Sequence, residues 1–573
     1  MSNRTAPYWM TAVALMAGVF TAPPRAQACG GLFCDASSPV NQAAERIVFA
    51  KNPDGTMTAV VQIMYSGPAE RFAWVLPVPG APEVEVSSDL ALQRLQVATN
   101  PTYQMNTEVE GTCGDDRTFL WGGSDDSAPT GFADGGTSFD AGTEDGPPVS
   151  VVDSGNVGPY DYVTLSVAEG TADPADVAVE WLQENAYDVD PLTRERLGPY
   201  LEDGLNLIAF RLAKDRSSGS IRPIFINYED DEPMIPIRPT AVAANEDMGV
   251  ITWVLGPSRA VPVNYRGLEL NEALIDWFNG ASNYDEVVTA AANEAGGQGF
   301  VTELAQPRES VSLTVMQSSE RAEWDRLRTT DWTGREGQLL QDELFLFVGW
   351  DGLRDVIEQH VPVPEGEDPQ DVYNCPGCYY GGEADIEGFD PAAFVASLGS
   401  EVVEPMVRTQ ELLDAHDYVT RMYTTMSPHE MTVDPIFGFN PVMADVSNSH
   451  TVTRIIECSP AVTRADAPWR VELASGDVVR GTGTTWPVSP STTDLPFNQR
   501  ILQLDRSSMG SLVEDNSAAI TAALEERNAG VPGPSSGGLC SVQAPGRTSS
   551  GGLPWLAAAA LLGALTHRRR PSP

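Results

Sequence analysis

Cysteine most constrains what this chain can fold into, because each disulfide bond fixes two segments against each other. Six cysteines form one set, and a seventh, Cys540, stands near the C-terminus. In an exported chain six cysteines indicate a disulfide framework, for which 15 pairings are possible. Proximity along the chain favours the pairs Cys29–Cys34 and Cys375–Cys378, which leaves Cys113–Cys458 as a long-range bond.

The first 28 residues have the pattern of a secretory signal peptide. Arg4 gives a positive start, Met10–Phe20 is an almost unbroken apolar run, and Ala26-Gln27-Ala28 is a small-x-small cleavage site. We therefore expect an exported protein whose mature chain begins at Cys29. A lipoprotein acylated at Cys29 is the alternative, although Ala26 fits that motif poorly.

The C-terminal residues carry a second processing pattern. Residues 553–565 are apolar but shorter than the ~20 residues that span a bilayer comfortably. The elements of the pattern are the sorting residue Cys540, a small-residue spacer, the apolar run, and Arg568, Arg569 and Arg570. Together they resemble the myxobacterial C-terminal sorting domain MYXO-CTERM. The resemblance implies membrane contact through residues 553–573 before processing, cleavage near Cys540 and delivery to the cell surface; a plain single-span anchor is the alternative.

The chain is strongly acidic, with a formal net charge of −45. Such a surface argues against nucleic acid or anionic lipid as partners, because phosphates would be repelled. Solubility at high ionic strength, loose calcium binding and a merely solvated surface all fit this composition. No cofactor is predicted beyond loosely bound calcium.

Helix and strand patterns are interspersed without a sustained βαβα alternation, which favours an α+β fold with mixed, mostly antiparallel sheets and packed helices. We expect an N-terminal α+β domain at 29–325, interrupted by a disordered acidic insertion at about 122–159. A second α+β region at 326–529 should pack on the first, followed by a flexible stalk at 530–552.

Several N-terminal elements have clear signals. Strand-like runs at 47–50 and 58–65, joined by a turn with Pro53 and Gly55, indicate a hairpin. A helix capped by Ser87 or Ser88 should end before Pro101. The strands at 206–212 and 221–228 look like a pair, and the proline-rich runs 74–80 and 233–239 that follow strand pairs resemble each other weakly.

Further along the chain the pattern predicts helices around 272–278, at 284–295, at 391–398 and at 402–422. A strand is expected at 344–348, a hairpin at 469–479, and a last helix at 512–527. Gly296 and Gly297 should stop the second of these helices.

The opening CGGLFC, NQAAERIVFA (41–50), TAVVQIMYSGPAERFAWVLPVPG (58–80) and SSDLALQRL (87–95) resemble the bacterial domain-of-unknown-function family 2330. Later segments, such as VTRMYTTMSPHEMTVDPIFGFNP (419–441) and DVSNSH (445–450), are similar to long members of that family. The resemblance implies an exported protein of unknown biochemical role, and it brings no catalytic, cofactor or metal residues with it.

No pattern in the sequence identifies a catalytic residue. Among the histidines, His416 is expected on a helix beside an apolar stripe, and His429 lies in a Ser-Pro-His-Glu capping box. Asp276 beside two aromatic residues is expected to be a solvent-facing neighbour of the core. The Cys375–Cys378 motif has thiol-redox spacing, but it lacks a βαβ context and a second CxxC, so a structural disulfide is favoured over redox or metal sites.

We therefore expect a non-enzymatic binding or structural protein of the cell surface or outer envelope, with release into the medium as an alternative. Its envelope or extracellular partner is not identified by the sequence. A secreted hydrolase that uses carboxylate acid–base chemistry and a thiol-redox protein that uses CPGC remain the other hypotheses.

Overall fold

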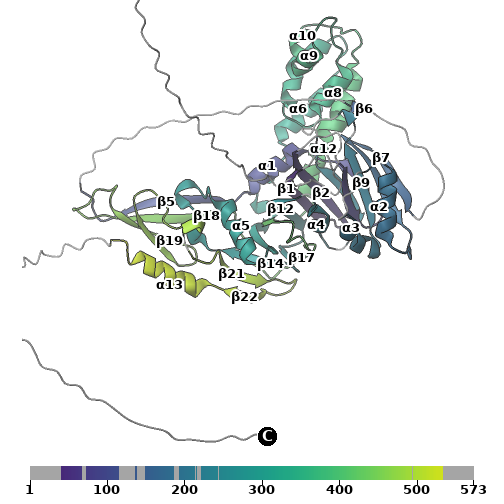
Figure 1. Cartoon of the computed structure of the whole chain (residues 1–573). Helices are drawn as coiled ribbons and strands as arrows, with labels where there is room; N and C mark the ends of the chain where they lie inside the picture. The colour runs from purple at the N-terminus through teal and green to yellow at the C-terminus, as the bar shows by residue number, and fades with distance from the viewer. Residues whose placement is uncertain are drawn as a thin grey trace, which may run out of the picture.

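The computed structural model describes residues 41–532 apart from 67–72, 115–135, 138–148, 186, 188–192, 213, 216–220, 231, 243 and 493. Helices and mostly antiparallel sheets are interspersed along the chain, so the α+β class is confirmed (Figure 1). Residues 1–28, where a signal peptide is predicted, and Cys29, Cys34, Cys540 and residues 553–573 lie outside the described residues.

A ten-stranded sheet forms the centre of the molecule. In spatial order its strands are β22 (Ser511–Asp515), β21 (Asn498–Gln503), β14 (Arg266–Leu270), β15 (Gly299–Pro307), β16 (Tyr418–Met426), β12 (Ala244–Gly256), β1 (Asn41–Lys51), β2 (Thr56–Ser66), β11 (Ile224–Glu229) and β4 (Glu83–Val86). Only the β1–β12 and β14–β15 pairs of this sheet are parallel. Strands from both sides of residue 325 lie within this sheet.

The β1–β2 hairpin is confirmed, and its sequence explains why it lies in the middle of the molecule. The Asn52 N–H donates to the Thr56 carbonyl at 2.9 Å, and Gly55 takes the positive φ of 96° that the turn requires. The run 47–50 is apolar at every position because both faces of β1 are covered. Val48 and Ala50 contact one core, and Ile47 and Phe49 contact another.

A helical subdomain connects the neighbouring strands β15 and β16 and lies at the top of Figure 1. Its elements are η5 (Arg308–Ser310), α6 (Ser318–Thr329), α7 (Glu336–Gln338), η6 (Leu339–Glu343), η7 (Leu344–Phe347), α8 (Leu353–His360), α9 (Pro369–Asn374), α10 (Pro376–Tyr380), α11 (Pro391–Ser397), η8 (Leu398–Val403) and α12 (Glu404–Asp414). Helix α1 (Asp89–Thr99), capped by Ser88 as expected, shares its core.

Two sequence-based assignments in this region are wrong. Residues 344–347 form the 3₁₀ helix η7 and not a strand, because Leu344 and Phe347 are buried in a helical core that the short apolar run cannot reveal. The helix expected at 402–422 ends at Asp414, and Tyr418 starts the central strand β16. Because strand β16 contains Arg421 and several threonines, its sequence does not indicate that the strand is buried.

A second sheet packs on the face of the central sheet opposite the helical subdomain. Its strands, in order, are β3 (Ala73–Val78), β9 (Asn206–Leu212), β8 (Tyr160–Val167) and β7 (Val149–Val157), and its outer face carries α2 (Pro174–Glu184) and α3 (Thr193–Glu202). Trp74 stacks on Phe210, with ring centroids 5.4 Å apart, in the core that this sheet shares with the central one.

The second sheet corrects two further expectations. Val149–Val157 is an ordered strand, although the sequence places it in the acidic insertion; its Ser, Asp, Gly and Asn content suits an exposed edge strand. The strands near 206–212 and 221–228 are not paired, because β9 joins the second sheet and β11 joins the central sheet. Residues 115–135 and 138–148 of the insertion region lie outside the described part.

A third sheet extends to the left in Figure 1. Its order is β20 (Val478–Thr482), β19 (Pro468–Glu472), β18 (Ser449–Glu457) and β5 (Thr102–Glu110), and it is covered by η3 (Glu272–Leu274), η4 (Trp277–Asn279) and α13 (Ser517–Asn528). The β19–β20 hairpin is confirmed. The last helix is shorter than expected, because β22 occupies residues 511–515.

The remaining elements are short connections, apart from one helix on the central sheet. They are α4 (Ile237–Thr240), α5 (Tyr284–Glu294), η9 (Pro490–Thr492) and the paired strands β13 (Ala260–Pro262) with β17 (Phe437–Phe439) and β6 (Gly136–Thr137) with β10 (Lys214–Asp215). Helix α5 packs on β14, β15 and β16, and Gly296 and Gly297 end it with φ of 79° and 75°.

Candidate functional site

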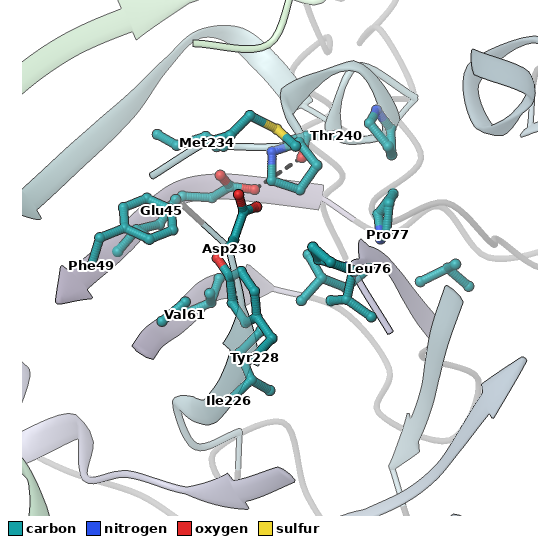
Figure 2. Close-up of a pocket in the computed structure, with 18 of the residues that line it drawn as sticks. Glu45, Phe49, Val61, Leu76, Pro77, Ile226, Tyr228, Asp230, Met234 and Thr240 are labelled. Carbon is teal, nitrogen blue, oxygen red and sulfur yellow. Dashed lines mark hydrogen bonds between the residues drawn. The ribbon is translucent and has the colours of Figure 1, made fainter. Parts of the chain in front are cut away.

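An apolar groove lies where the central sheet meets β3 and the segment around α4 (Figure 2). Five segments supply its walls, and the side chains labelled in the figure surround it. The lining residues are Glu45, Ile47 and Phe49 of β1; Ala59 and Val61 of β2; Trp74 to Pro79; Ile226, Tyr228 and Asp230; and Met234, Ile235, Pro236, Pro239 and Thr240.

Proline explains why these segments leave a groove. Pro77 lies in β3, an edge strand of the second sheet, where a missing N–H is tolerated. Pro236 directly precedes the short helix α4 and Pro239 lies within it, so this stretch cannot add a strand to either sheet. The two proline-rich runs that resemble each other in sequence thus line the same groove, although one is a strand and the other a short helix.

The groove is narrow and mostly apolar, with acidic groups at one side. Its enclosed volume is about 40 Å³, which suits a few water molecules or one inserted side chain and not a whole drug-sized ligand. Glu45 lies on the same face of β1 as Ile47 and Phe49 and is 4 % exposed. Its carboxylate accepts a 3.0 Å hydrogen bond from Thr240. Burial, and then the charge of Asp230, raise the pKa of Tyr228.

A second polar cluster lies between the central and third sheets. Arg421 Nε is 2.6 Å from Glu303 Oε2, and the two side chains are only 4 % and 1 % exposed. Glu303 also accepts a 2.8 Å hydrogen bond from Tyr284, and burial raises its pKa despite the neighbouring Arg421. The sequence analysis did not identify this ion pair. The signal that could have indicated it is a single charged residue inside each of two strand-like apolar runs.

The same cluster extends to His450 of the DVSNSH segment. His450 Nδ1 is 3.0 Å from Glu272 Oε1, and the imidazole stacks on Tyr103 with ring centroids 4.4 Å apart. Tyr103 in turn contacts Trp277 edge to face. These contacts join β5 and β18 to the segment that leaves β14, so they fix the third sheet against the central one.

The other residues that the sequence analysis singled out form hydrogen bonds within the fold. His360 is 2.9 Å from Ser397 Oγ, and His416, which follows α12, is 5 % exposed and bonded to two backbone carbonyls. In the Ser-Pro-His-Glu segment with His429, the Ser427 N–H donates to Glu430 Oε2 at 2.7 Å, as a capping box requires. The Glu430 N–H, however, donates to the Ser427 backbone carbonyl and not to the hydroxyl, and the segment is a turn and not a helix start. Asp276 caps η4 by accepting from the N–H groups of residues 278 and 279.

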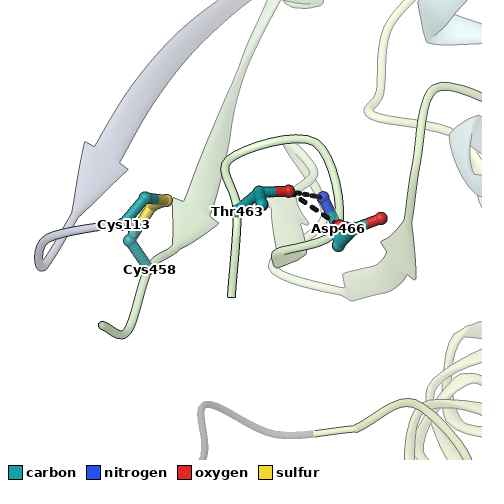
Figure 3. The surroundings of a disulfide bond; sticks show 4 residues. All are labelled: Cys113, Cys458, Thr463 and Asp466. Atoms are coloured by element: carbon teal, nitrogen blue, oxygen red, sulfur yellow. Dashed lines mark hydrogen bonds between the residues drawn. A yellow bond between two sulfur atoms is a disulfide. The ribbon is translucent and has the colours of Figure 1, made fainter. Parts of the chain in front are cut away.

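Two disulfide bonds join described cysteines. Cys113, just after β5, pairs with Cys458, just after β18, with Cα atoms 4.7 Å apart and a sequence separation of 345 (Figure 3). Cys375 pairs with Cys378 where α9 gives way to α10, in the helical subdomain. Within the described ranges no group of three or more His, Cys, Asp or Glu residues could hold a metal ion.

In the part of the chain that the structure describes, no helix has the length and apolar character needed to cross a membrane. The run at 553–565 lies outside that part.

Fold and site together define a disulfide-bonded α+β protein with an apolar groove between two packed sheets. The chain belongs to DUF2330, a family of uncharacterized proteins conserved in bacteria, whose model matches residues 23–316, just over half of the chain. The matched range contains the whole groove and ends before α6, so most of the helical subdomain lies beyond it. No curated protein and no solved structure gives a significant match.

Proposed function

We propose that this protein is exported to the cell surface and acts there as a non-enzymatic binding protein, with the apolar groove as its binding site. The observation that carries the proposal is the groove itself, to which five segments contribute apolar side chains around a narrow opening. A groove of this kind provides affinity by burying apolar surface and needs no reactive group.

The cysteines support export. Disulfide bonds persist in oxidising compartments and are rare in the cytosol. The Cys113–Cys458 bond links the ends of β5 and β18, neighbouring strands of the third sheet that lie 345 residues apart in the chain, so it stabilises the tertiary fold directly. The signal-peptide pattern of residues 1–28 and the tail that resembles MYXO-CTERM support the same proposal.

The groove and its surroundings favour one kind of occupant, an apolar side chain presented by a basic protein segment. The enclosed volume of about 40 Å³ accommodates one side chain. Glu45 and Asp230 line the groove, and the chain carries a net charge of −45. Electrostatic complementarity therefore attracts a basic partner and repels an acidic one.

Peptide binding tests the groove. Fluorescence polarisation with the full chain would compare a peptide carrying Leu between lysines with two matched peptides, one with Glu for Lys and one with Ser for Leu. We expect the Lys/Leu peptide to bind at least tenfold more tightly than either. Met234→Arg, at the half-buried rim, should abolish this preference by placing a cation in the groove.

Val348→Arg is the matched control, because Val348 is 73 % exposed on the helical subdomain, away from the groove. Equal affinity for all three peptides, or equal effects of the two arginine substitutions, would contradict the groove as binding site. Location is tested separately by protease treatment of intact cells followed by non-reducing peptide mapping. A mature chain that is protected from the protease inside the cell would contradict export.

The same groove also gives the hydrolase hypothesis its one structural support, since Glu45 and Asp230 both line it. A carboxylate hydrolase would release reducing sugar from envelope polysaccharide, and Glu45→Gln and Asp230→Asn would each abolish that release. Binding alone predicts no product from the unaltered protein.

A further inference from the structure

A cation occupies an inward-facing position on the third sheet. Val452, Arg454 and Ile456 alternate along β18, so their side chains point to the same face. Val452 and Ile456 belong to the core of this sheet, and Val471, the β19 residue that pairs with Arg454, is fully buried. Arg454 is half-buried at this position, where a charged side chain commonly has a counter-charge.

Arg454 has no acidic partner among the described residues. Its guanidinium carbon lies 5.0 Å from the ring centroid of Phe278, and its Nε is buried without a hydrogen bond. Burial, and then the charge of Arg464, lower the pKa of Arg454. Arg464 also lacks an ion pair or hydrogen bond within the described ranges, so two like charges lie close together without a counter-charge.

The acidic side chains nearest in sequence are already engaged. Glu457 forms ion pairs with Arg470 at 2.6 Å and with Arg480. Asp466 accepts a 2.7 Å hydrogen bond from Thr463 in the turn beside the Cys113–Cys458 bond (Figure 3). Neither carboxylate forms an ion pair with Arg454 or Arg464 in the described part of the chain, so an anion from outside can take that place.

The two arginines line one open pocket of about 190 Å³. The other lining residues are Ile456, Ala465, Ala467, Trp469, Gly483 and Thr484. Guanidinium groups match the geometry of phosphate and sulfate oxygens, and a threonine hydroxyl can donate one more hydrogen bond. Ile456, Ala467 and Trp469 are buried, whereas Ala465 is exposed and Gly483 half-buried, so the last two offer surface for an organic group attached to the anion.

From this geometry we infer that the pocket binds a phosphate or sulfate group carried on a small organic molecule, and that Arg454 and Arg464 hold the oxyanion. The site lies on the third sheet and is independent of the groove. The acidic surface elsewhere does not prevent binding, because charges more than about 8 Å away are largely screened at physiological ionic strength.

Calorimetric titration of the full chain with inorganic phosphate and with glucose 6-phosphate, at constant ionic strength, tests the assignment. We expect both to bind, with glucose 6-phosphate the tighter. Arg464 is exposed, so Arg464→Gln should fold normally and weaken both affinities at least tenfold, and Arg464→Lys should weaken them less.

Arg328→Gln is the matched control, since Arg328 is an exposed arginine on α6 that pairs with Asp325. It should leave both affinities unchanged. The assignment fails if neither probe binds, if Arg464→Gln binds like the unaltered protein, or if Arg328→Gln loses as much affinity. Equal affinity for the two probes would overturn the organic part of the assignment.

Discussion

Replacing Arg421 by Met tests the buried ion pair that joins β15 to β16. The substitution leaves Glu303 charged and 1 % exposed, with Tyr284 as its remaining hydrogen-bond donor among the described residues. It also removes the bonds from Arg421 to Thr99 and Asn100 at the end of α1. Removing one partner of a buried pair costs about 3–5 kcal/mol. That cost lowers the folded-to-unfolded ratio by roughly two to more than three orders of magnitude.

The cost should depend on pH. Burial already raises the pKa of Glu303 above its ordinary value of 4.5, and Arg421 is the strongest influence that lowers it again. Without Arg421 the folded state holds this proton to still higher pH than the unfolded state does. The stability of the Arg421→Met protein is therefore retained below the ordinary pKa of Glu303 and lost as pH rises through the pKa that Glu303 has in the folded state. Arg421→Met should consequently be more damaging at pH 8 than at pH 5.

Urea unfolding followed by far-UV circular dichroism measures this at both pH values. Arg500→Met is the control, because the Arg500–Glu269 pair is exposed and should contribute only about 0–1 kcal/mol. The double variant Arg421→Met with Glu303→Gln should cost less than the two single costs added together. A cost below about 1 kcal/mol for Arg421→Met, or equal costs at pH 5 and pH 8, would refute the reasoning.

Three further outcomes are expected. Cys113→Ser breaks the long-range bond to Cys458 and should cost about 2–5 kcal/mol of stability, measured by thermal unfolding without reductant; reductant should then have little further effect. Ser88→Ala removes the N-cap of α1 and a bond to the helical subdomain, and should cost about 1–2 kcal/mol in the same assay. Hydrogen bonds from residues 507 and 508 lower the pKa of Asp505 to about 2, and Ser508→Ala should raise the NMR titration midpoint of Asp505 towards 3.8; an unchanged midpoint would contradict this.

Short-range signals in the sequence predicted the elements that depend on interactions within a few residues, such as helix caps and tight turns. Ser88 supplies its own cap to α1, and Gly55 provides the angle that the β1–β2 turn needs. The same reasoning gave the wrong secondary structure at 344–348, a short apolar run, and at 418–422, where polar and apolar residues are mixed. In both segments the surface against which the segment packs sets the conformation. For the candidate site, the sequence showed that the two proline-rich runs resemble each other weakly. It did not show that both runs line the same groove.

The sequence by itself determined the α+β class, the hairpin at the start of the fold, the cap of α1, the end of α5 and the family. These follow from capping, turn and periodicity rules that act within a few residues. Tertiary structure alone decided which strands share a sheet, that Glu303 meets Arg421, and that Arg454 and Arg464 line one pocket. Such pairings depend on the packing of segments far apart in the chain, and no local pattern specifies which distant surface each segment will meet.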